Sequence, residues 1–137
     1  MSLVLDSSMC LSWCFDDERP AIATTVLEKV GEEGALVPAL WHLEVANALQ
    51  TAVRRGRITT AFRDEVLTEL AALSITVDAE THRHAWRSTM GLADRFQLTT
   101  YDAAYLELAY RTRLPLATLD DALLDAGSHL GVKMIRG

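Results

Sequence analysis

Leu3-Val4-Leu5-Asp6-Ser7-Ser8, at the start of the 137-residue chain, is the stretch that decides the fold class. Its first half is a short apolar run, which is typical of a buried strand, and its second half is polar and typical of a turn that caps a helix. A charge at the end of a buried strand needs a partner or a cation. We therefore predict that Asp6 lies at the carboxyl end of a strand, in a polar site.

Outward from this stretch, short apolar runs alternate with segments of helical periodicity. This order predicts an α/β fold with a mainly parallel sheet and helices on both faces. Gly31 and Gly34 are expected to stop the second helix, and the length fits a single domain, residues 1–137. The further strands are predicted at 35–37, 74–77, 114–118 and 132–135, and the helices at 9–15, 21–30, 40–54, 60–73, 79–96, 101–111 and near Leu123 and Leu124.

Composition limits the class of protein. Half of the residues are hydrophobic, yet no apolar stretch approaches the roughly 20 residues of a membrane span, and no leader is visible, so we expect a cytoplasmic protein without a membrane segment. Cys10 and Cys14 are expected to be reduced core residues. The net charge of −6 would repel a polyanion if it were evenly spread. Carboxylates gathered at a divalent metal stop repelling phosphate once the cation is bound, so their placement matters more than their number.

Four acids come from four separate elements: Asp6, Glu44, Asp102 and Asp120. Glu44 interrupts the apolar side of a helix, and a carboxylate buried there without a partner would be costly. Asp102 and Asp120 could equally cap the helices that they begin. Asp6 and Asp120 should share the carboxyl edge of the sheet, where ligands bind in such folds. The apolar side of the Glu44 helix is predicted to consist of Leu40, Leu43, Ala46, Leu49 and Val53.

The chemistry that these acids favour is binding of Mg²⁺ or Mn²⁺, which take oxygen ligands and keep several waters. Zinc would require histidine or cysteine at a recognisable spacing, which the sequence lacks. Asp121, next to Asp120, is a possible auxiliary ligand. Glu107 and Asp125 are expected to be solvated helix residues.

Taken together, the acidic segments resemble the PIN-domain family, and specifically its small bacterial and archaeal toxin ribonucleases of the VapC type. Each motif is short, but their order and spacing span nearly the whole chain. The matching stretches are Val4-Leu5-Asp6-Ser7-Ser8, Pro38-Ala39-Leu40-Trp41-His42-Leu43-Glu44-Val45-Ala46-Asn47-Ala48-Leu49, Thr100-Tyr101-Asp102-Ala103-Ala104-Tyr105-Leu106-Glu107-Leu108-Ala109 and Leu116-Ala117-Thr118-Leu119-Asp120.

The resemblance implies a three-layer α/β/α fold, a homodimer, and a cognate antitoxin that inserts a segment near the active site. It also implies that Asp6, Glu44, Asp102 and Asp120 form the metal site. Many relatives carry a basic or neutral residue where this chain has Asp121, so the negative charge here is higher. The polar residues that the resemblance places in support around the acids are Ser8, Asn47 and Thr118.

The hypothesis from the sequence is therefore a metal-dependent endoribonuclease that hydrolyses RNA phosphodiester bonds with water as the nucleophile. The resemblance suggests products with 5′-phosphate and 3′-hydroxyl ends. Arginines around the acids could grip RNA, although each could equally be a solvated helix residue. Two alternatives stay open: a magnesium-binding phosphotransfer domain of the receiver type, and a PIN fold that only binds a partner. The candidate arginines are Arg54, Arg55, Arg57 and Arg87.

Overall fold

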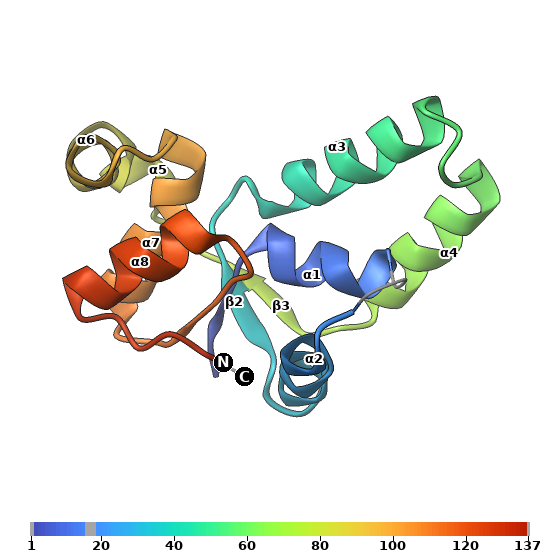
Figure 1. The fold of residues 1–137 in the computed structure, drawn as a ribbon, viewed down its shortest axis with the longest axis horizontal. Coiled ribbons are helices and arrows are strands. Elements are labelled where there is room, and N and C mark those ends of the chain that lie inside the picture. The colour runs from blue at the N-terminus through green and yellow to red at the C-terminus, as the bar shows by residue number, and fades with distance from the viewer. Residues whose placement is uncertain (1, 16–18, 137) are drawn as a thin grey trace.

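A four-stranded parallel sheet forms the centre of the computed structural model, which describes residues 2–15 and 19–136. The strands lie in the order β3-β2-β1-β4 (Figure 1). In the central strand, Val4 pairs with Leu36 on one side and with Leu116 on the other. The chain therefore begins in the middle of the sheet and builds outward in both directions. The strands are β1 (Val4–Leu5), β2 (Ala35–Val37), β3 (Ile75–Val77) and β4 (Leu116–Ala117).

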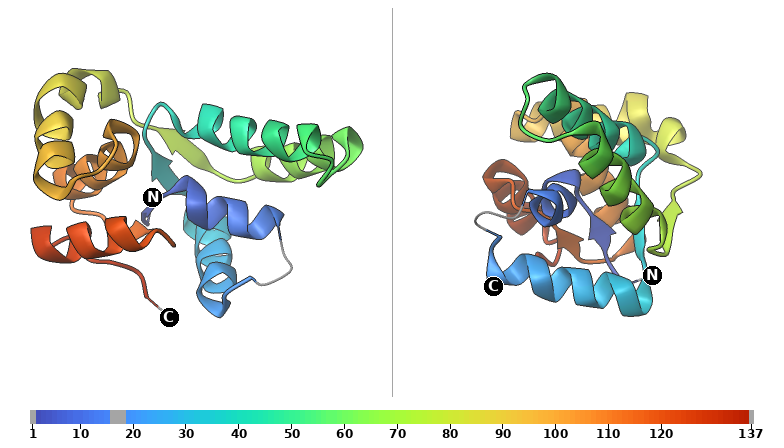
Figure 2. Two further views of the ribbon diagram at one scale, coloured as in Figure 1. Left: turned by 45° about the horizontal axis from the view of Figure 1, so that its top comes forward. Right: turned by 90° about the vertical axis from the view of Figure 1, so that its right-hand side faces the viewer.

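Helices cover both faces of this sheet, which confirms the three-layer α/β/α fold (Figure 2). One layer holds α1 (Ser7–Cys14), α2 (Ala21–Glu33), α3 (Trp41–Arg54) and α4 (Thr60–Ala71). The other holds α5 (Thr81–His84), α6 (Met90–Phe96), α7 (Thr100–Thr112) and α8 (Asp121–Leu130), with a π-helical segment, η2 (Ala85–Thr89), between α5 and α6. Within the described ranges, no helix combines the length and the apolar character that crossing a membrane requires.

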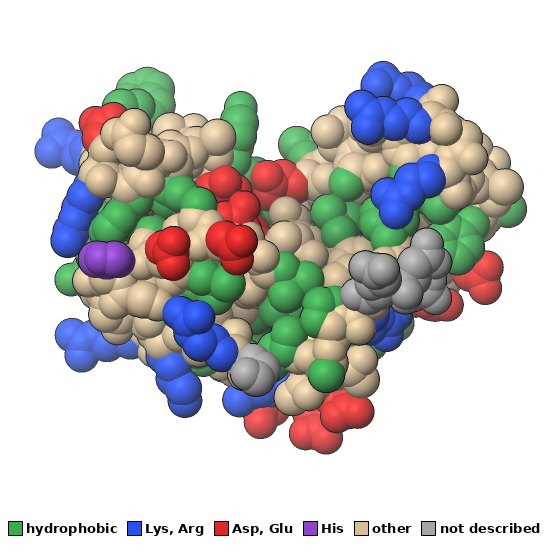
Figure 3. Space-filling view, viewed as in Figure 1, with side chains coloured by type: hydrophobic (Ala, Val, Ile, Leu, Met, Phe, Trp, Pro, Cys, Tyr) green, Lys and Arg blue, Asp and Glu red, His purple; other side chains and the backbone are tan. Residues whose placement is uncertain are grey.

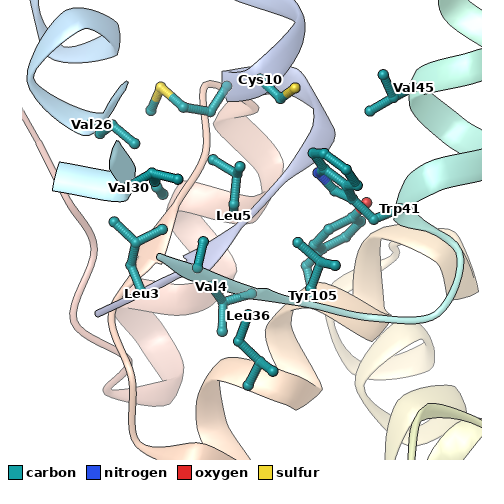
Figure 4. Close-up of a cluster of buried hydrophobic side chains, with 14 of the residues drawn as sticks. Leu3, Val4, Leu5, Cys10, Val26, Val30, Leu36, Trp41, Val45 and Tyr105 are labelled. Atoms are coloured by element: carbon teal, nitrogen blue, oxygen red, sulfur yellow. The ribbon is translucent and has the colours of Figure 1, made fainter. Parts of the chain in front are cut away.

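The core lies between the sheet and the two helix layers. Leu3, Val4 and Leu5 are completely buried, as a central strand covered on both faces requires. Figure 4 shows side chains from α1, α2, α3 and α7 closing around this strand. Cys10 and Cys14 are buried free thiols in this core, as predicted.

The second helix ends later than the sequence suggested. Gly31 lies within α2, which continues to Glu33, and Gly34 alone ends it with a φ of 74°. A Cβ atom on Gly34 would lie 2.7 Å from the carbonyl oxygen of Ser74. Glycine is therefore required at Gly34 both by the left-handed backbone and by the close approach of the neighbouring chain.

Two further expectations hold only in part. The helix predicted over 79–96 follows the expected path, but its middle is the π-helical segment η2. The strand predicted over 132–135 is reduced to one parallel bridge between Leu116 and Met134. Its hydrogen bonds, from the Leu116 N–H to Lys133 O and from the Ile135 N–H to Leu116 O, still extend the sheet edge beyond β4.

The predicted apolar face of α3 was wrong for Leu43 and Ala46, which are exposed. The buried row consists instead of Trp41, Val45, Leu49 and Ala52. The helix carries two apolar rows, and the one that includes the large Trp41 ring faces the core. Leu43 is left 76% exposed on the opposite side.

Candidate active site

Asp6 stands at the centre of the site, directly after β1. It occupies the N-cap position of α1, but its side chain makes no capping hydrogen bond. Instead its Oδ2 accepts hydrogen bonds from the hydroxyls of Ser8 and of Thr118, the latter at 2.7 Å. Because Asp6 is only 3% exposed, these two hydroxyls replace part of the water that a carboxylate loses on burial.

The two hydroxyl side chains also connect Asp6 to the chain around Asp120. Ser8 Oγ lies 3.2 Å from Thr118 Oγ1 and accepts the Leu119 N–H at 3.0 Å. Thr118 Oγ1 accepts the Asp120 N–H at 3.0 Å. The carboxyl ends of β1 and β4 are thus joined by one hydrogen-bonded network, with Ser8 and Thr118 at its centre.

Asp120 caps a helix, as the sequence analysis allowed for an acid at this position. It is the N-cap of α8, and its Oδ1 accepts the Leu123 N–H at 2.9 Å. This hydrogen bond occupies one oxygen of the carboxylate. Asp120 therefore fixes the start of α8, and a second oxygen remains for the site.

Asp102, in contrast, does not cap its helix. The N-cap of α7 is Thr99, whose Oγ1 accepts the Asp102 N–H at 3.1 Å. The Asp102 carboxylate is partly buried in the first turn of α7. The capping explanation thus fails for Asp102 as it does for Asp6.

Glu44 is held by two hydroxyls that the sequence analysis did not select. Tyr105 Oη donates to Glu44 Oε1, and Ser7 Oγ donates to the same oxygen at 3.4 Å. Tyr105 is completely buried on α7, and burial together with this hydrogen bond raises the pKa of its phenol. Tyr105 lies three residues after Asp102, so the two side chains share one side of α7. This spacing is the sequence feature that could have identified Tyr105 as part of the site.

The electrostatics of the site are repulsive. Burial raises the pKa of Asp6, as do the charges of Glu44 and Asp120, while the Ser8 and Thr118 hydroxyls oppose the rise. Burial, and then the charges of Asp6 and Asp120, raise the pKa of Asp102. Among the described residues, no arginine, lysine or histidine forms a salt bridge with any of the four acids. Asp6 and Asp102 therefore each lie within the influence of other negative charges of the set.

Figure 3 shows where acidic side chains gather, in a hollow between the start of α3 and the layer that contains α7. In residues 2–15 and 19–136, no three acidic, histidine or cysteine side chains converge closely enough to enclose a metal ion. The side-chain atoms that could bind a metal at this site are all carboxylate and hydroxyl oxygens. Mg²⁺ and Mn²⁺ prefer such oxygens and retain several waters, so an open arrangement of carboxylates that have no basic partner in residues 2–15 and 19–136 fits them.

None of the remaining candidates forms a hydrogen bond or a salt bridge with this network within the described part of the chain. Asn47 is exposed on α3, and Asp121 is exposed in the first turn of α8. Three of the candidate arginines lie at the end of α3 and in the following turn, where Arg57 packs its guanidinium 4.6 Å from the Phe15 ring centre. All four candidates are exposed: Arg54, Arg55, Arg57 and Arg87.

The expectation that Glu107 is solvated was wrong. Its side chain is 6% exposed and accepts hydrogen bonds from Arg111, with Arg111 Nε 2.7 Å from Glu107 Oε2. Arg111 also pairs with Asp78, at 2.7 Å. The sequence could not reveal this burial, because Asp78 lies 33 positions away from Arg111.

Comparison with known proteins agrees with this architecture. The model of the PIN domain matches residues 3–128. Ribonuclease VapC3 of Pyrobaculum aerophilum is 30% identical over 125 residues, which cover 91% of this chain and 94% of that protein. Ribonuclease VapC3 of Mycobacterium tuberculosis is 37% identical over 93 residues, 65% of this chain and 62% of that protein.

A solved structure shares the fold. The crystal structure of PAE2754 from Pyrobaculum aerophilum superposes with a TM-score of 0.71 and 23% identity, and the match covers 98% of this chain and 91% of that one. At that identity the superposition speaks for the fold alone. The domain match, the relatives and the parallel sheet with its acidic edge lead to one conclusion: the chain belongs to the PIN-domain family and is of its VapC type.

Proposed function

We propose that this chain is an endoribonuclease, the toxin of a toxin–antitoxin pair, and that it hydrolyses RNA phosphodiester bonds at Asp6, Glu44, Asp102 and Asp120. The observation that carries the proposal is a set of four carboxylates that form no salt bridge among the described residues. Two of them, Asp6 and Asp102, have pKa values raised by burial and by the charges of the other acids. The relatives named as ribonucleases support it. We extend the proposal to residues 1–137 as one catalytic domain.

Asp6 and Asp102 are the proposed direct ligands of Mg²⁺ or Mn²⁺, and Asp120 would contribute the oxygen that does not cap α8. When bound, the ion lowers the pKa of a water and stabilises charge on the scissile phosphate. The protein fixes the acids beforehand: Ser8 and Thr118 hold Asp6, and the cap holds Asp120.

Glu44 has a different proposed role, as a ligand or as the group that orients the attacking water. Its Oε1 is occupied by Tyr105 and Ser7, so Oε2 is the oxygen available to the reaction. An acceptor held within hydrogen-bond reach of water is what general-base catalysis requires. Asn47 and Asp121 stay proposed as outer polar support, and the arginines as contacts for the RNA backbone.

The test is RNA cleavage by the purified protein with Mg²⁺ or Mn²⁺, and then with a chelator. We expect cleavage to stop on chelation and in Asp102→Asn. Asp125→Asn is the matched control, because it makes the same change at an exposed acid on α8 and should cleave normally. Cleavage that survives chelation or Asp102→Asn would overturn the proposal. A protein that folds and cleaves no RNA with either metal would favour the alternative of a binding module.

The proposed partners are the RNA substrate, a cognate antitoxin and a second copy of the chain. Expression of a toxin should arrest growth unless its antitoxin is co-expressed. We expect arrest with the wild type and none with Asp102→Asn. Normal growth in cells that accumulate the folded wild-type protein without a partner would contradict the toxin role.

A further inference from the structure

Two large apolar side chains that directly precede acids of the site in the sequence are exposed. Tyr101, 64% exposed, directly precedes Asp102 in α7, and Leu43, 76% exposed, directly precedes Glu44 in α3. Figure 3 shows hydrophobic side chains on both sides of the hollow in which the acids gather. A single exposed apolar residue is common on protein surfaces, but here each of two facing helices exposes one next to an acid of the site.

The position of Tyr101 on α7 fixes the side of the helix on which its ring lies. Tyr101 and Tyr105 are four residues apart and therefore share one side of the helix, with Tyr101 one turn nearer the helix start. The Tyr105 hydroxyl reaches Glu44. The Tyr101 ring consequently lies on the side of α7 that faces the acids, at its solvent end.

Nothing within the described chain uses this ring. It takes part in none of the aromatic or cation–π pairs of the structure, which join Trp41 with His42, Arg57 with Phe15 and Arg95 with Phe96. Its exposure means that the ring contributes little to the core. An aromatic face left open beside a phosphate-binding position is the geometry in which single-stranded nucleic acids are held by stacking.

We propose that Tyr101 is a substrate-positioning residue, which stacks on an unpaired nucleobase next to the phosphate bound at the acids. The inference rests on the proposed function. Bases in a duplex are paired and stacked on their neighbours and cannot offer a face to the ring. Stacking tolerates any base, so Tyr101 positions a base without reading its identity.

The test measures binding separately from hydrolysis. A short single-stranded RNA that contains 2-aminopurine, whose fluorescence falls when it stacks, is titrated with full-length protein in the Asp102→Asn background. We expect quenching, and we expect Tyr101→Ala to abolish it and to weaken affinity about 5- to 150-fold, the equivalent of one lost stacking contact. Tyr101→Phe keeps the ring and should bind as the parent does.

Tyr110→Ala is the matched control, because Tyr110 is 58% exposed on the same helix, nine residues away. It should leave both affinity and quenching unchanged. An RNA duplex of the same sequence should bind more weakly than the single strand, and equally to the parent and to Tyr101→Ala.

Several results would overturn the inference: equal binding by parent and Tyr101→Ala, loss of affinity without a change in quenching, or equal affinity for duplex and single strand. Loss of antitoxin binding in Tyr101→Ala with RNA binding intact would assign the ring to a protein partner and also overturn it. The proposed function fails separately, because a wild-type protein that stacks RNA but never cleaves it contradicts catalysis and leaves the stacking intact.

Discussion

Two groups of carboxylates in this fold are built in opposite ways. Asp78 and Glu107 share Arg111, whose guanidinium lies 2.7 Å from an oxygen of each. The Asp6 carboxylate accepts hydrogen bonds from two hydroxyls. Among the described residues, neither Asp6 nor Glu44, Asp102 or Asp120 forms a salt bridge. The first group links the residue that follows β3 to α7. The second group has no basic side chain as a partner in the described residues.

The pKa values follow the same division. Burial would raise the pKa of Asp78, but the hydrogen bonds from Arg111, the Glu80 N–H and Thr81 outweigh it, and the pKa lies below its usual value. The pKa of Asp6 lies above its usual value, because burial dominates and neighbouring charges add to it. A carboxylate that is paired with an arginine of the same chain already has its charge balanced within the fold. One that lacks such a partner is suited to binding a cation from solution.

The largest effect should come from removing the charge of Asp6. Asp6→Asn should reduce RNA cleavage about 100- to 1,000-fold, the usual loss when one preorganised electrostatic group is removed. Its thermal stability in chelator should equal or exceed that of the wild type, since a buried like charge is gone and the amide oxygen can still accept from Ser8 and Thr118. An RNA cleavage assay measures the rate, and thermal unfolding in chelator measures the stability. A lower unfolding temperature of Asp6→Asn would show that the Asp6 charge stabilises the fold, and the difference from the Arg111 group would then disappear.

Removing Arg111 from the group of Asp78 and Glu107 should lower the stability of the fold, whereas Asp6→Asn should lower RNA cleavage and leave the stability unchanged or higher. Arg111→Ala leaves Asp78 and Glu107 without their partner, and it should lower the free energy of unfolding by about 2–3 kcal/mol, less than a fully buried pair would lose. Urea denaturation measures this. Adding Asp78→Asn and Glu107→Gln to Arg111→Ala should restore part of the loss, and the absence of any recovery would argue that the packing of Arg111, not its charge, matters.

A smaller effect is expected from Tyr105→Phe, which removes the hydroxyl that holds Glu44 and keeps the buried ring. Cleavage should fall about two- to tenfold, the value of one hydrogen bond. Tyr110→Phe, at an exposed tyrosine of the same helix, is the control. Equal rates in the three proteins would mean that Ser7 alone positions Glu44.

The smallest effect is the pH dependence that Asp78 contributes to stability. Because its folded pKa lies below the unfolded value of 3.8, its contribution is present above about pH 3.8 and is lost as the pH falls through the folded pKa. Urea denaturation of wild type and Asp78→Asn between pH 6 and pH 2.5 should therefore show a difference that shrinks on acidification. A difference that does not change with pH would assign the role of Asp78 to its hydrogen bonds alone.

The sequence predicted the edge of the sheet better than it predicted the surfaces of the helices. Apolar runs mark strands, so the placement of Asp6 and Asp120 at one edge was readable and is confirmed. On α3 two apolar rows compete, and tertiary packing selected the row of Trp41 over that of Leu43. The polar environment of Glu107 depends on Asp78, which no local pattern connects with it.

The candidate site was predictable as a set of charges and less so as a set of contacts. Ser8 and Thr118 were expected as support, and they hydrogen-bond to Asp6. Tyr105 was missed because an aromatic residue within an apolar helix side is typical of a core, and its hydroxyl gives no signal until Glu44 is opposite it. The π-helical segment η2 has no sequence rule that would have located it.

The hydrogen bond between Thr118 and Asp6 joins residues 112 positions apart, across the pairing of the first strand with the last named strand. During synthesis on the ribosome, Asp6 emerges first and stays without Thr118 and Asp120 until residues 118–120 have also emerged. A nascent chain that ends before these residues cannot complete the acidic site. This order of assembly ties the completion of the site to the emergence of β4 and of the first turn of α8.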